Sequence, residues 1–325
     1  MSTKSSVLAF LEENRGKNIS GAQISQALQV TRSAVWKAIE DLRKDGYEIT
    51  AATNRGYCLS DGNNFLSPEG IRPYLLPQFG VLPIHVYPEV ESTNLTAKQL
   101  ALEGATNGTA VLAETQHMGK GRMGRTFLSP RQSGVYLSLI LRLEQEMEQV
   151  LLITAAAAVA TARAIQKAAG IDPQIKWVND IYCNSKKVCG ILTEAVTSME
   201  SRTIDFMVVG IGVNVSMKRE DFPEELRQTA TSLELEGAGR ISRNRLAAEI
   251  INQLLLLSQN LTSPDWMEEY KARSCILGKE IHIFRGGTQA RGTALDITPQ
   301  GHLAVRLEDG SNILLNSGEI SIRPV

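Results

Sequence analysis

One seven-residue run constrains the fold more than any other feature: Gly119-Lys120-Gly121-Arg122-Met123-Gly124-Arg125. The segments before and after it, residues 108–115 and 134–143, have the side-chain pattern of β-strands. The three glycines allow the backbone to approach a ligand closely. The three interleaved cations favour an anionic ligand, such as a phosphate or a carboxylate. The pattern therefore predicts a loop that is tethered by strands at both ends and closes over an anion.

The same run also fits the G-x-G-x-x-G pattern of dinucleotide-binding proteins, but its context differs. That fingerprint opens a helix, whereas residues 126–130 lead to Pro130 and then to a strand-like segment. A P-loop is excluded because no Gly-Lys-Ser/Thr follows four residues after a first glycine. An ordinary cationic turn stays open as the alternative to an anion-binding loop.

Length and composition indicate a soluble globular protein of two or three domains. The 325 residues carry a formal net charge of −1, so a contact with nucleic acid requires a local basic patch. The long apolar run at residues 150–169 contains polar side chains and indicates a buried helix, and no secretory signal precedes it. The four cysteines form no C-x-x-C pair, which argues against a zinc site or a disulfide framework. We expect a cytoplasmic protein.

The first 60 residues have the pattern of a winged helix-turn-helix. Helical periodicity covers residues 5–14, 22–28 and 31–44, and two strand-like runs around Asn54-Arg55-Gly56 would form the wing. Eight cations against six acids are too small an excess to argue DNA binding, so a helical interaction domain is the alternative. The candidates for DNA contacts are Arg32, Ser33, Lys37 and Arg55.

Changes in composition and residue pattern along the chain predict the domain boundaries. Residues 1–62 would be the DNA-binding domain, and residues 63–83, rich in turns and proline, a linker with one short helix. Residues 84–274 predict a central α/β domain with a mixed sheet. Short alternating runs separated by turn residues predict a small SH3-like β-barrel over residues 275–325. The fold class is thus α/β and multidomain.

Polar groups interrupt several segments of the central domain. Glu91-Ser92-Thr93-Asn94 precedes a predicted helix at 95–103, and capping of this helix is the simpler explanation for Ser92 and Thr93. Residues 175–182 predict a strand that Lys176, Asn179 and Asp180 interrupt. Either a ligand or metal, or a turn at the end of the strand, accounts for these three.

Two further segments contain residues with more than one explanation. Lys187 enters an apolar run and is either snorkelling or aimed at an anion. Gly210 and Gly212 lie in the predicted core strand 203–215. They would let a flat ring lie against the backbone, although a bulge is the plainer explanation.

Together these segments resemble the bifunctional biotin–protein ligases that also repress biotin operons. The winged-helix-like start and the barrel-like end extend the resemblance over essentially the whole chain. Lys120 departs from the arginine of many relatives, which loses a bidentate fork but keeps the charge. Val178 departs from the usual proline, which loosens the backbone but removes no functional group. The resemblance rests on Glu91-Ser92-Thr93-Asn94, Gln116 with the glycine-rich run, Lys176-Trp177-Val178-Asn179-Asp180, Lys187-Val188-Cys189-Gly190-Ile191-Leu192 and Gly210-Ile211-Gly212-Val213-Asn214.

The resemblance implies an ATP-dependent, AMP-forming biotin–[acetyl-CoA-carboxylase] ligase. Biotin carboxylate would attack the α-phosphate of ATP, giving biotinyl-5′-AMP, and a lysine of a biotin carboxyl carrier protein domain would take the biotinyl group. Biotin and ATP are then substrates, with Mg²⁺. The resemblance also implies a homodimer that binds operator DNA when biotinyl-5′-AMP acts as corepressor, and no membrane partner.

By the same resemblance, Arg122 and Lys187 would be catalytic, and Asp180 would bind the metal. Two alternatives stay open: a regulator that binds biotin without chemistry, and a lipoyl-type acyl ligase. The implied ATP-binding residues are Lys176, Asn179, Asp180 and Asn214. The implied residues for biotin and biotinyl-5′-AMP are Ser92, Thr93, Asn94, Gln116, Gly119, Lys120, Gly121, Arg122, Lys187 and Gly190.

Overall fold

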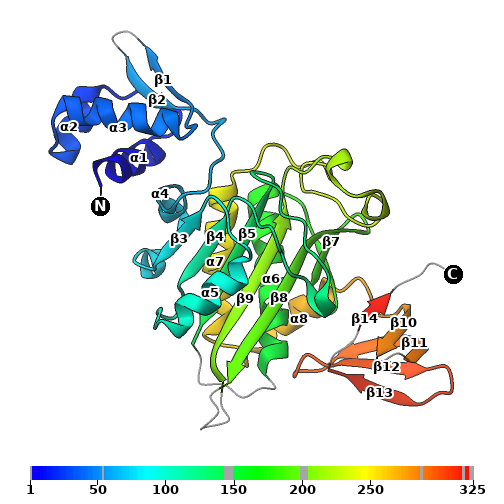
Figure 1. Ribbon diagram of the computed structural model, residues 1–325. Coiled ribbons are helices and arrows are strands. Elements are labelled where there is room, and N and C mark those ends of the chain that lie inside the picture. Colours follow the sequence, from blue (N-terminus) through cyan, green and yellow to red (C-terminus); the bar gives the residue numbers. More distant parts are fainter. Residues whose placement is uncertain are drawn as a thin grey trace.

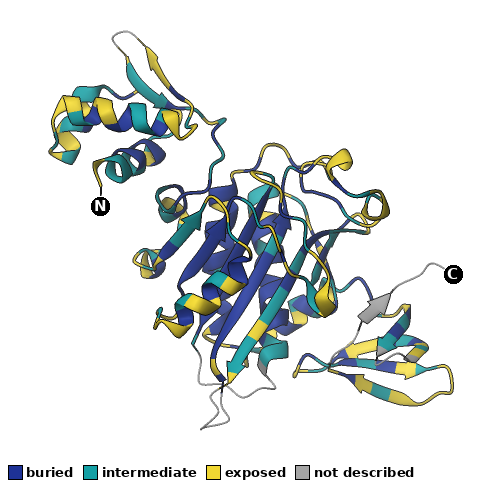
Figure 2. Cartoon of the chain, in the orientation of Figure 1, coloured by how far each residue is buried: buried dark blue, intermediate teal, exposed yellow. Residues whose placement is uncertain are grey.

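The computed structural model describes residues 2–52, 55–142, 149–197, 204–285, 288–316 and 319–321. Figure 1 shows a small helical unit at the N-terminus, a central sheet with helices packed against it, and a small β-unit at the C-terminal end. Buried residues concentrate along the central strands, and exposed residues lie in the loops and on the outer helix faces (Figure 2).

The N-terminal unit is the predicted winged helix-turn-helix. Its helices are α1 (Thr3–Glu13), α2 (Gly21–Leu28) and α3 (Arg32–Lys44), followed by the antiparallel strands β1 (Ile49–Ala52) and β2 (Gly56–Leu59). Ser20 and Thr31 cap α2 and α3 through their side chains, which fixes where each helix begins. Apolar side chains of all three helices form a separate core. Residues 53–54 of the predicted wing lie outside the described residues.

Residues 63–83 differ from the linker that their prolines suggested. They form α4 (Pro68–Ile71) and the 3₁₀ turns η1 (Arg72–Tyr74) and η2 (Pro77–Phe79). Leu66, Ile71 and Phe79 are buried in the core of the central domain. The turn-rich composition concealed these apolar anchors, which attach the segment to the sheet.

The central sheet has seven strands in the order β3-β4-β5-β9-β8-β7-β6. It is mixed, as predicted, because β3 pairs with β4 in parallel while each other neighbouring pair is antiparallel. The strands are β3 (Ile84–Tyr87), β4 (Ala110–Ala113), β5 (Gly134–Leu141), β6 (Gln174–Lys176), β7 (Asp180–Cys183), β8 (Lys186–Thr197) and β9 (Ile204–Asn214). Leu143 and Thr203, predicted as strand ends, lie outside the described residues.

Helices cover both faces of this sheet. On one face α5 (Thr93–Leu102) packs on β4, β5 and β9 through a small cluster that includes Ala97, Ile140 and Phe206. The other face packs on α6 (Gln149–Ala169) and α7 (Arg243–Ser258), and α8 (Pro264–Ala272) packs on α6. Within the described residues, α6 contains the one helical stretch apolar enough to cross a membrane by length and composition, and 67% of its apolar window is buried in the protein.

The prediction of one strand over residues 175–182 is wrong. The segment is a hairpin of β6 and β7, with its turn at Trp177-Val178-Asn179. Trp177 turns into the core, where its indole N–H donates to the Gly301 carbonyl at 2.9 Å. This contact with the C-terminal unit is distant in sequence, so local periodicity could not reveal it.

The C-terminal unit is a five-stranded antiparallel sheet in the order β13-β12-β11-β10-β14. Its inner side chains, Ile281, Ala294 and Leu303 among them, continue the core of the central domain. The strands are β10 (Glu280–Arg285), β11 (Thr288–Ile297), β12 (Leu303–Leu307), β13 (Asn312–Leu315) and β14 (Glu319–Ser321).

Candidate active site

A cavity of about 50 Å³ lies where the glycine-rich loop meets α5, β8 and β9. All of the residues predicted to bind biotin line this cavity except Gly119: Ser92, Thr93, Asn94, Gln116, Lys120, Gly121, Arg122, Lys187 and Gly190. The sequence separations between them are large, so the fold brings the predicted residues together. Gly119 lies beside it, with its backbone close to the Phe127 carbonyl and Ser129.

The N-terminal end of α5 forms one wall of the cavity. The Thr93 amide donates to Gln116 Oε1 at 2.8 Å, and the Thr93 hydroxyl donates to the same oxygen at 3.0 Å. Gln116 Nε2 donates to Ser129 Oγ at 2.8 Å, which fixes the orientation of the amide. Ser92 is the N-cap residue of α5, yet its side chain makes no capping bond. The capping explanation is therefore wrong for the side chains of Ser92 and Thr93.

Ser138, which the sequence did not single out, contacts two residues of this wall. It is fully buried on β5, and its Oγ lies 2.8 Å from Thr93 Oγ1 and 2.7 Å from Asn94 Oδ1. Asn94 Nδ2 donates to Glu194 Oε2 at 2.6 Å. A single serine in an otherwise apolar strand was the available signal, since a buried hydroxyl needs a partner.

Two glycines of β9 bring side chains of other segments against its backbone. A Cβ on Gly212 would lie 2.5 Å from the ring of Phe127, and one on Gly210 would overlap the Asn94 carboxamide. The pairing of β9 with β5 and β8 is regular through both positions. The bulge explanation is therefore wrong here. Phe127, the aromatic residue that follows the glycine-rich loop, supplies the ring that lies on Gly212.

The two residues predicted to be catalytic converge from different elements. Arg122 begins the short turn η3 (Arg122–Gly124), and its Nη1 donates to Asn179 Oδ1 at 3.1 Å. Lys187 lies on β8, and its Nζ is 2.7 Å from Asp180 Oδ1. Asn179 is itself held because its Nδ2 donates to the Ile191 carbonyl at 2.9 Å. The β6–β7 hairpin therefore supplies a polar partner to each cation.

A second cavity, of about 330 Å³, adjoins the first. It is lined by all four residues predicted to bind ATP, Lys176, Asn179, Asp180 and Asn214. The two cavities share Gly121, Arg122, Phe127, Asn179 and Lys187 as lining residues. A ligand in either cavity would thus be in reach of the same two cations.

Aromatic side chains that the sequence analysis did not single out complete the second cavity. Phe127, Tyr182 and Phe222 line it. Burial, together with the nearby carboxylate of Asp180, raises the pKa of Tyr182, so its phenol stays neutral. Lys176 Nζ lies 5.6 Å from the Tyr182 ring centroid. Phe222 comes from the segment that joins β9 to α7.

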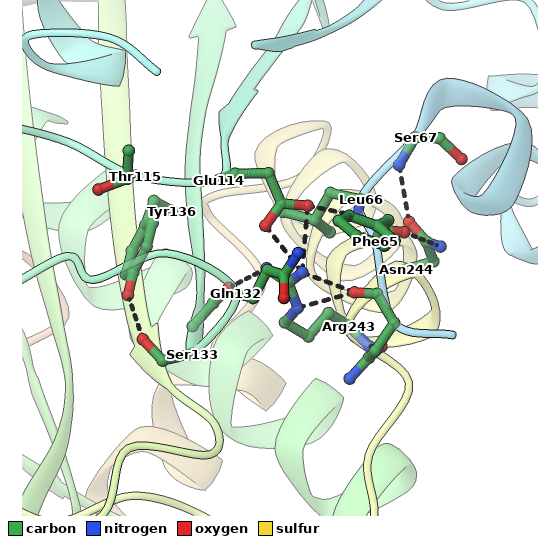
Figure 3. A network of polar contacts seen from close by, with 12 residues as sticks. Phe65, Leu66, Ser67, Glu114, Thr115, Gln132, Ser133, Tyr136, Arg243 and Asn244 are labelled. Atoms are coloured by element: carbon green, nitrogen blue, oxygen red, sulfur yellow. Dashed lines mark hydrogen bonds and ion pairs between the residues drawn. The ribbon is translucent and has the colours of Figure 1, made fainter. Parts of the chain in front are cut away.

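A buried polar network anchors the strand that delivers Gln116 (Figure 3). Arg243, fully buried at the start of α7, places Nη2 2.8 Å from Glu114 Oε2. The same guanidinium donates to the carbonyls of Asn64, at 2.6 Å, and Gly134, at 3.0 Å. Glu114 Oε1 accepts the Leu66 amide at 2.7 Å. The network therefore joins residues 64–66 to the strands that border the glycine-rich loop.

The predicted DNA-contact residues lie in the N-terminal unit. Arg32, Ser33 and Lys37 are exposed on α3, and Arg55 is exposed in the turn directly before β2. Within the described residues none of these cations has an acidic partner in an ion pair. They are therefore available to an external anion.

Comparison with known proteins finds a matching family for each of the three units. The Biotin/lipoate A/B protein ligase family matches residues 86–214, an HTH domain matches residues 3–58, and the Biotin protein ligase C terminal domain matches residues 276–323. The Bifunctional ligase/repressor BirA of Bacillus subtilis is 38% identical over 301 residues, which cover 93% of this chain and 90% of that protein.

This chain belongs to the BirA family of bifunctional ligase/repressors. The BirA of Escherichia coli is also similar, at 29% identity over 95% of this chain and 94% of that protein. A solved biotin protein ligase from Aquifex aeolicus in complex with biotin and ATP matches with a TM-score of 0.61 and 27% identity. That match covers 75% of this chain and 99% of the solved chain.

Proposed function

We propose that this BirA-family chain is a biotin–protein ligase and a transcriptional repressor. It activates biotin with ATP to biotinyl-5′-AMP and transfers the biotinyl group to a lysine of a biotin carboxyl carrier protein domain. The observation that carries the ligase activity is the pair of adjoining cavities with Arg122 and Lys187 in their shared wall. Two reactants that meet at a common cationic wall suit an in-line displacement, in which positioning and charge neutralisation supply most of the acceleration.

Biotin occupies the smaller cavity and ATP the larger. The polar wall of Ser92, Thr93, Asn94 and Gln116 holds the ureido ring, and the biotin carboxylate points to Lys187. Ligand pockets commonly measure about 300 Å³ or more, so a cavity of about 50 Å³ has to enlarge when biotin enters. The glycine-rich loop, with Phe127 at its end, is the part of the wall that moves.

The second cavity suits the phosphates of ATP with Mg²⁺. Asp180 is the one carboxylate among its described lining residues, and no group of three or more His, Cys, Asp or Glu in the described chain could hold a metal. Mg²⁺ commonly binds through one or two carboxylates together with substrate phosphates and water, so a single aspartate fits. When bound, Mg²⁺ neutralises phosphate charge. Asn214 and the aromatic side chains hold the adenosine.

Charge and hydrogen bonding assign the remaining roles of the chain in the reaction. Arg122, oriented by Asn179, stabilises the negative charge that develops on the α-phosphate. Lys187 holds the attacking carboxylate and the adenylate phosphate. No side chain needs to form a covalent bond with biotin.

In the repressor function, the N-terminal unit binds DNA. When biotinyl-5′-AMP is bound, the chain forms a homodimer in the cytoplasm, and two α3 helices and two wings bind a two-fold operator. The exposed cations on α3 and in the turn before β2 support this assignment.

Biotin-dependent ATP–pyrophosphate exchange tests the ligase activity. We expect exchange with biotin and none with lipoate, and a loss of at least about tenfold in Arg122→Ala, equivalent to about 1.4 kcal/mol. Arg131→Ala is the matched control, because Arg131 is exposed near the loop but lines neither cavity. No exchange in the wild type would leave a protein that binds biotin without chemistry. Exchange with lipoate instead would indicate a lipoyl-type ligase.

The corepressor role needs its own test. Gel-shift affinity for operator DNA should rise when biotin and ATP are both present, compared with biotin alone. If affinity does not change, the coupling between the adenylate and DNA binding is wrong.

A further inference from the structure

Trp36 differs from the other two tryptophans of the chain. Trp177 and Trp266 are buried, and their indole N–H groups donate to the carbonyls of Gly301 and Leu261 at 2.9 and 3.2 Å. Trp36 on α3 is 59% exposed, and its N–H has no hydrogen-bond partner among the described residues. An exposed aromatic side chain with an unused donor is suited to contact another molecule, because its body is apolar and its edge is polar.

Trp36 shares one face of α3 with three of the predicted DNA-contact residues. Lys37 lies one position from Trp36, Ser33 three and Arg32 four, and all of them are exposed. Arg32 and Lys37 have no ion-pair partner in the described part of the chain. By contrast, Glu40 and Asp41 on the same helix each pair with a cation three residues further on. The N-terminal half of α3 therefore presents an indole between unpaired positive charges.

We propose that Trp36 is a specificity-determining residue that contacts base edges in the major groove of operator DNA. This inference rests on the repressor function proposed above. In helix-turn-helix proteins the N-terminal residues of the second helix reach the bases. The indole offers apolar surface to a thymine methyl group and one donor to a base acceptor. Arg32 and Lys37, which flank it, hold the phosphates and position the helix.

The charge around Trp36 favours DNA over a protein as its partner. A protein partner would have to cover an apolar ring flanked by two unneutralised cations, whereas a DNA groove supplies apolar methyl groups between two rows of phosphates. A base contact by Trp36 and a phosphate contact by Lys37 should affect DNA binding in different ways. An apolar base contact affects the preferred sequence alone, whereas a phosphate contact affects every sequence and the salt dependence.

The experiment uses the full chain with biotin and ATP. A duplex selected from a random-sequence library serves as the specific probe, and a scrambled duplex of the same composition is the reference. Anisotropy titrations at several salt concentrations then compare the wild type with Trp36→Ala, Trp36→Phe and Lys37→Ala.

We expect Trp36→Ala to lose at least about tenfold in affinity for the selected duplex, with a change within about twofold on the scrambled one and an unchanged salt slope. Trp36→Phe should be intermediate, because it keeps apolar surface but loses the N–H donor. Lys37→Ala should weaken binding to both duplexes and reduce the salt slope by about one. Because Trp36 is exposed, its replacement should leave the domain folded. Retained binding of the scrambled duplex verifies this.

Equal losses of Trp36→Ala on both duplexes, or no loss on either, would overturn the assignment. An unchanged DNA affinity combined with weaker self-association in sedimentation would also overturn it and assign the surface to a protein contact. If the wild type selects no duplex while pyrophosphate exchange proceeds, the repressor function itself fails, and the role of Trp36 fails with it.

Discussion

Lys187 Nζ lies 2.7 Å from Asp180 Oδ1, so the lysine expected to hold the biotin carboxylate pairs with the aspartate expected to hold the metal. The two side chains come from the neighbouring antiparallel strands β7 and β8. A biotin carboxylate that reaches Lys187 therefore has to compete with Asp180 for the same ammonium group.

This competition predicts opposite effects of two variants on biotin binding. Asp180→Asn should bind biotin, in the absence of ATP, at least as tightly as the wild type, because Lys187 no longer has an anionic partner. The same variant should lose at least about tenfold in pyrophosphate exchange, since the charge that would hold Mg²⁺ is gone. Lys187→Ala should weaken both biotin binding and pyrophosphate exchange. Calorimetry with biotin and the exchange assay measure the two quantities, and equal weakening of biotin binding in both variants would contradict the prediction.

Gly210→Ala should displace Asn94 from the wall of the first cavity. The new Cβ would overlap the Asn94 carboxamide, and β9 cannot retreat because it pairs on both sides. We expect the KM for biotin to rise about tenfold or more, from an overpacking cost of about 1–3 kcal/mol. Gly239→Ala is the matched control, since a Cβ there meets no atom within 4 Å. An unchanged KM in Gly210→Ala would show that Asn94 does not contribute to the biotin site.

The buried pair of Arg243 and Glu114 predicts a large loss of stability when one partner is removed. Glu114→Gln or Arg243→Met should lower the free energy of unfolding of the central domain by about 3–5 kcal/mol, because an uncompensated charge stays buried. Asp205→Ala, which removes a half-exposed partner of Arg142 at 3.5 Å, should change it by less than about 1 kcal/mol. Urea unfolding followed by tryptophan fluorescence compares the variants, in a Trp36→Phe background so that Trp177 and Trp266 report on the central domain. Equal effects of buried and exposed pairs would contradict this reasoning.

Glu269 predicts one component of acid sensitivity. Burial by itself raises the pKa of this carboxyl, but the hydrogen bonds from Arg163 and Arg273 outweigh burial and hold the pKa below its ordinary value of 4.5. A carboxyl with a lowered pKa in the folded state stabilises the protein above pH 4.5, and this contribution is lost as the pH falls. Glu269→Gln should therefore reduce stability near neutral pH by up to about 1 kcal/mol for each ion pair, and reduce it less in acid. Parallel stability curves for both proteins from neutral to acid pH would contradict this assignment.

Sequence periodicity predicted those elements whose signal is local. The long apolar helix α6 and the core strand β9 agree with their predicted positions to within a residue or two in the described chain. The order of the three units also follows from local residue patterns, since the helix-turn-helix and the C-terminal strands contain their own turn residues.

The missed features depend on contacts between distant segments. Ser138 and Asn94 are 44 residues apart, and Trp177 and Gly301 are 124 apart, so neither pairing leaves a trace in a local pattern. Phe127 looked like an ordinary residue after the loop, because its role depends on Gly212 in a strand formed much later in the chain. The roles of the candidate binding residues stay predictions that the experiments above test.

The contacts of Arg243 with residues 64–66 affect how the chain can be divided. Trimming the chain at the start of β3 would remove the Asn64 carbonyl and the Leu66 amide, two of the groups that satisfy Arg243 and Glu114. A catalytic fragment that begins near residue 62 keeps them and retains the buried anchors Leu66, Ile71 and Phe79. The short segment after the wing thus belongs physically to the enzyme half, and the DNA-binding half can be detached only ahead of it.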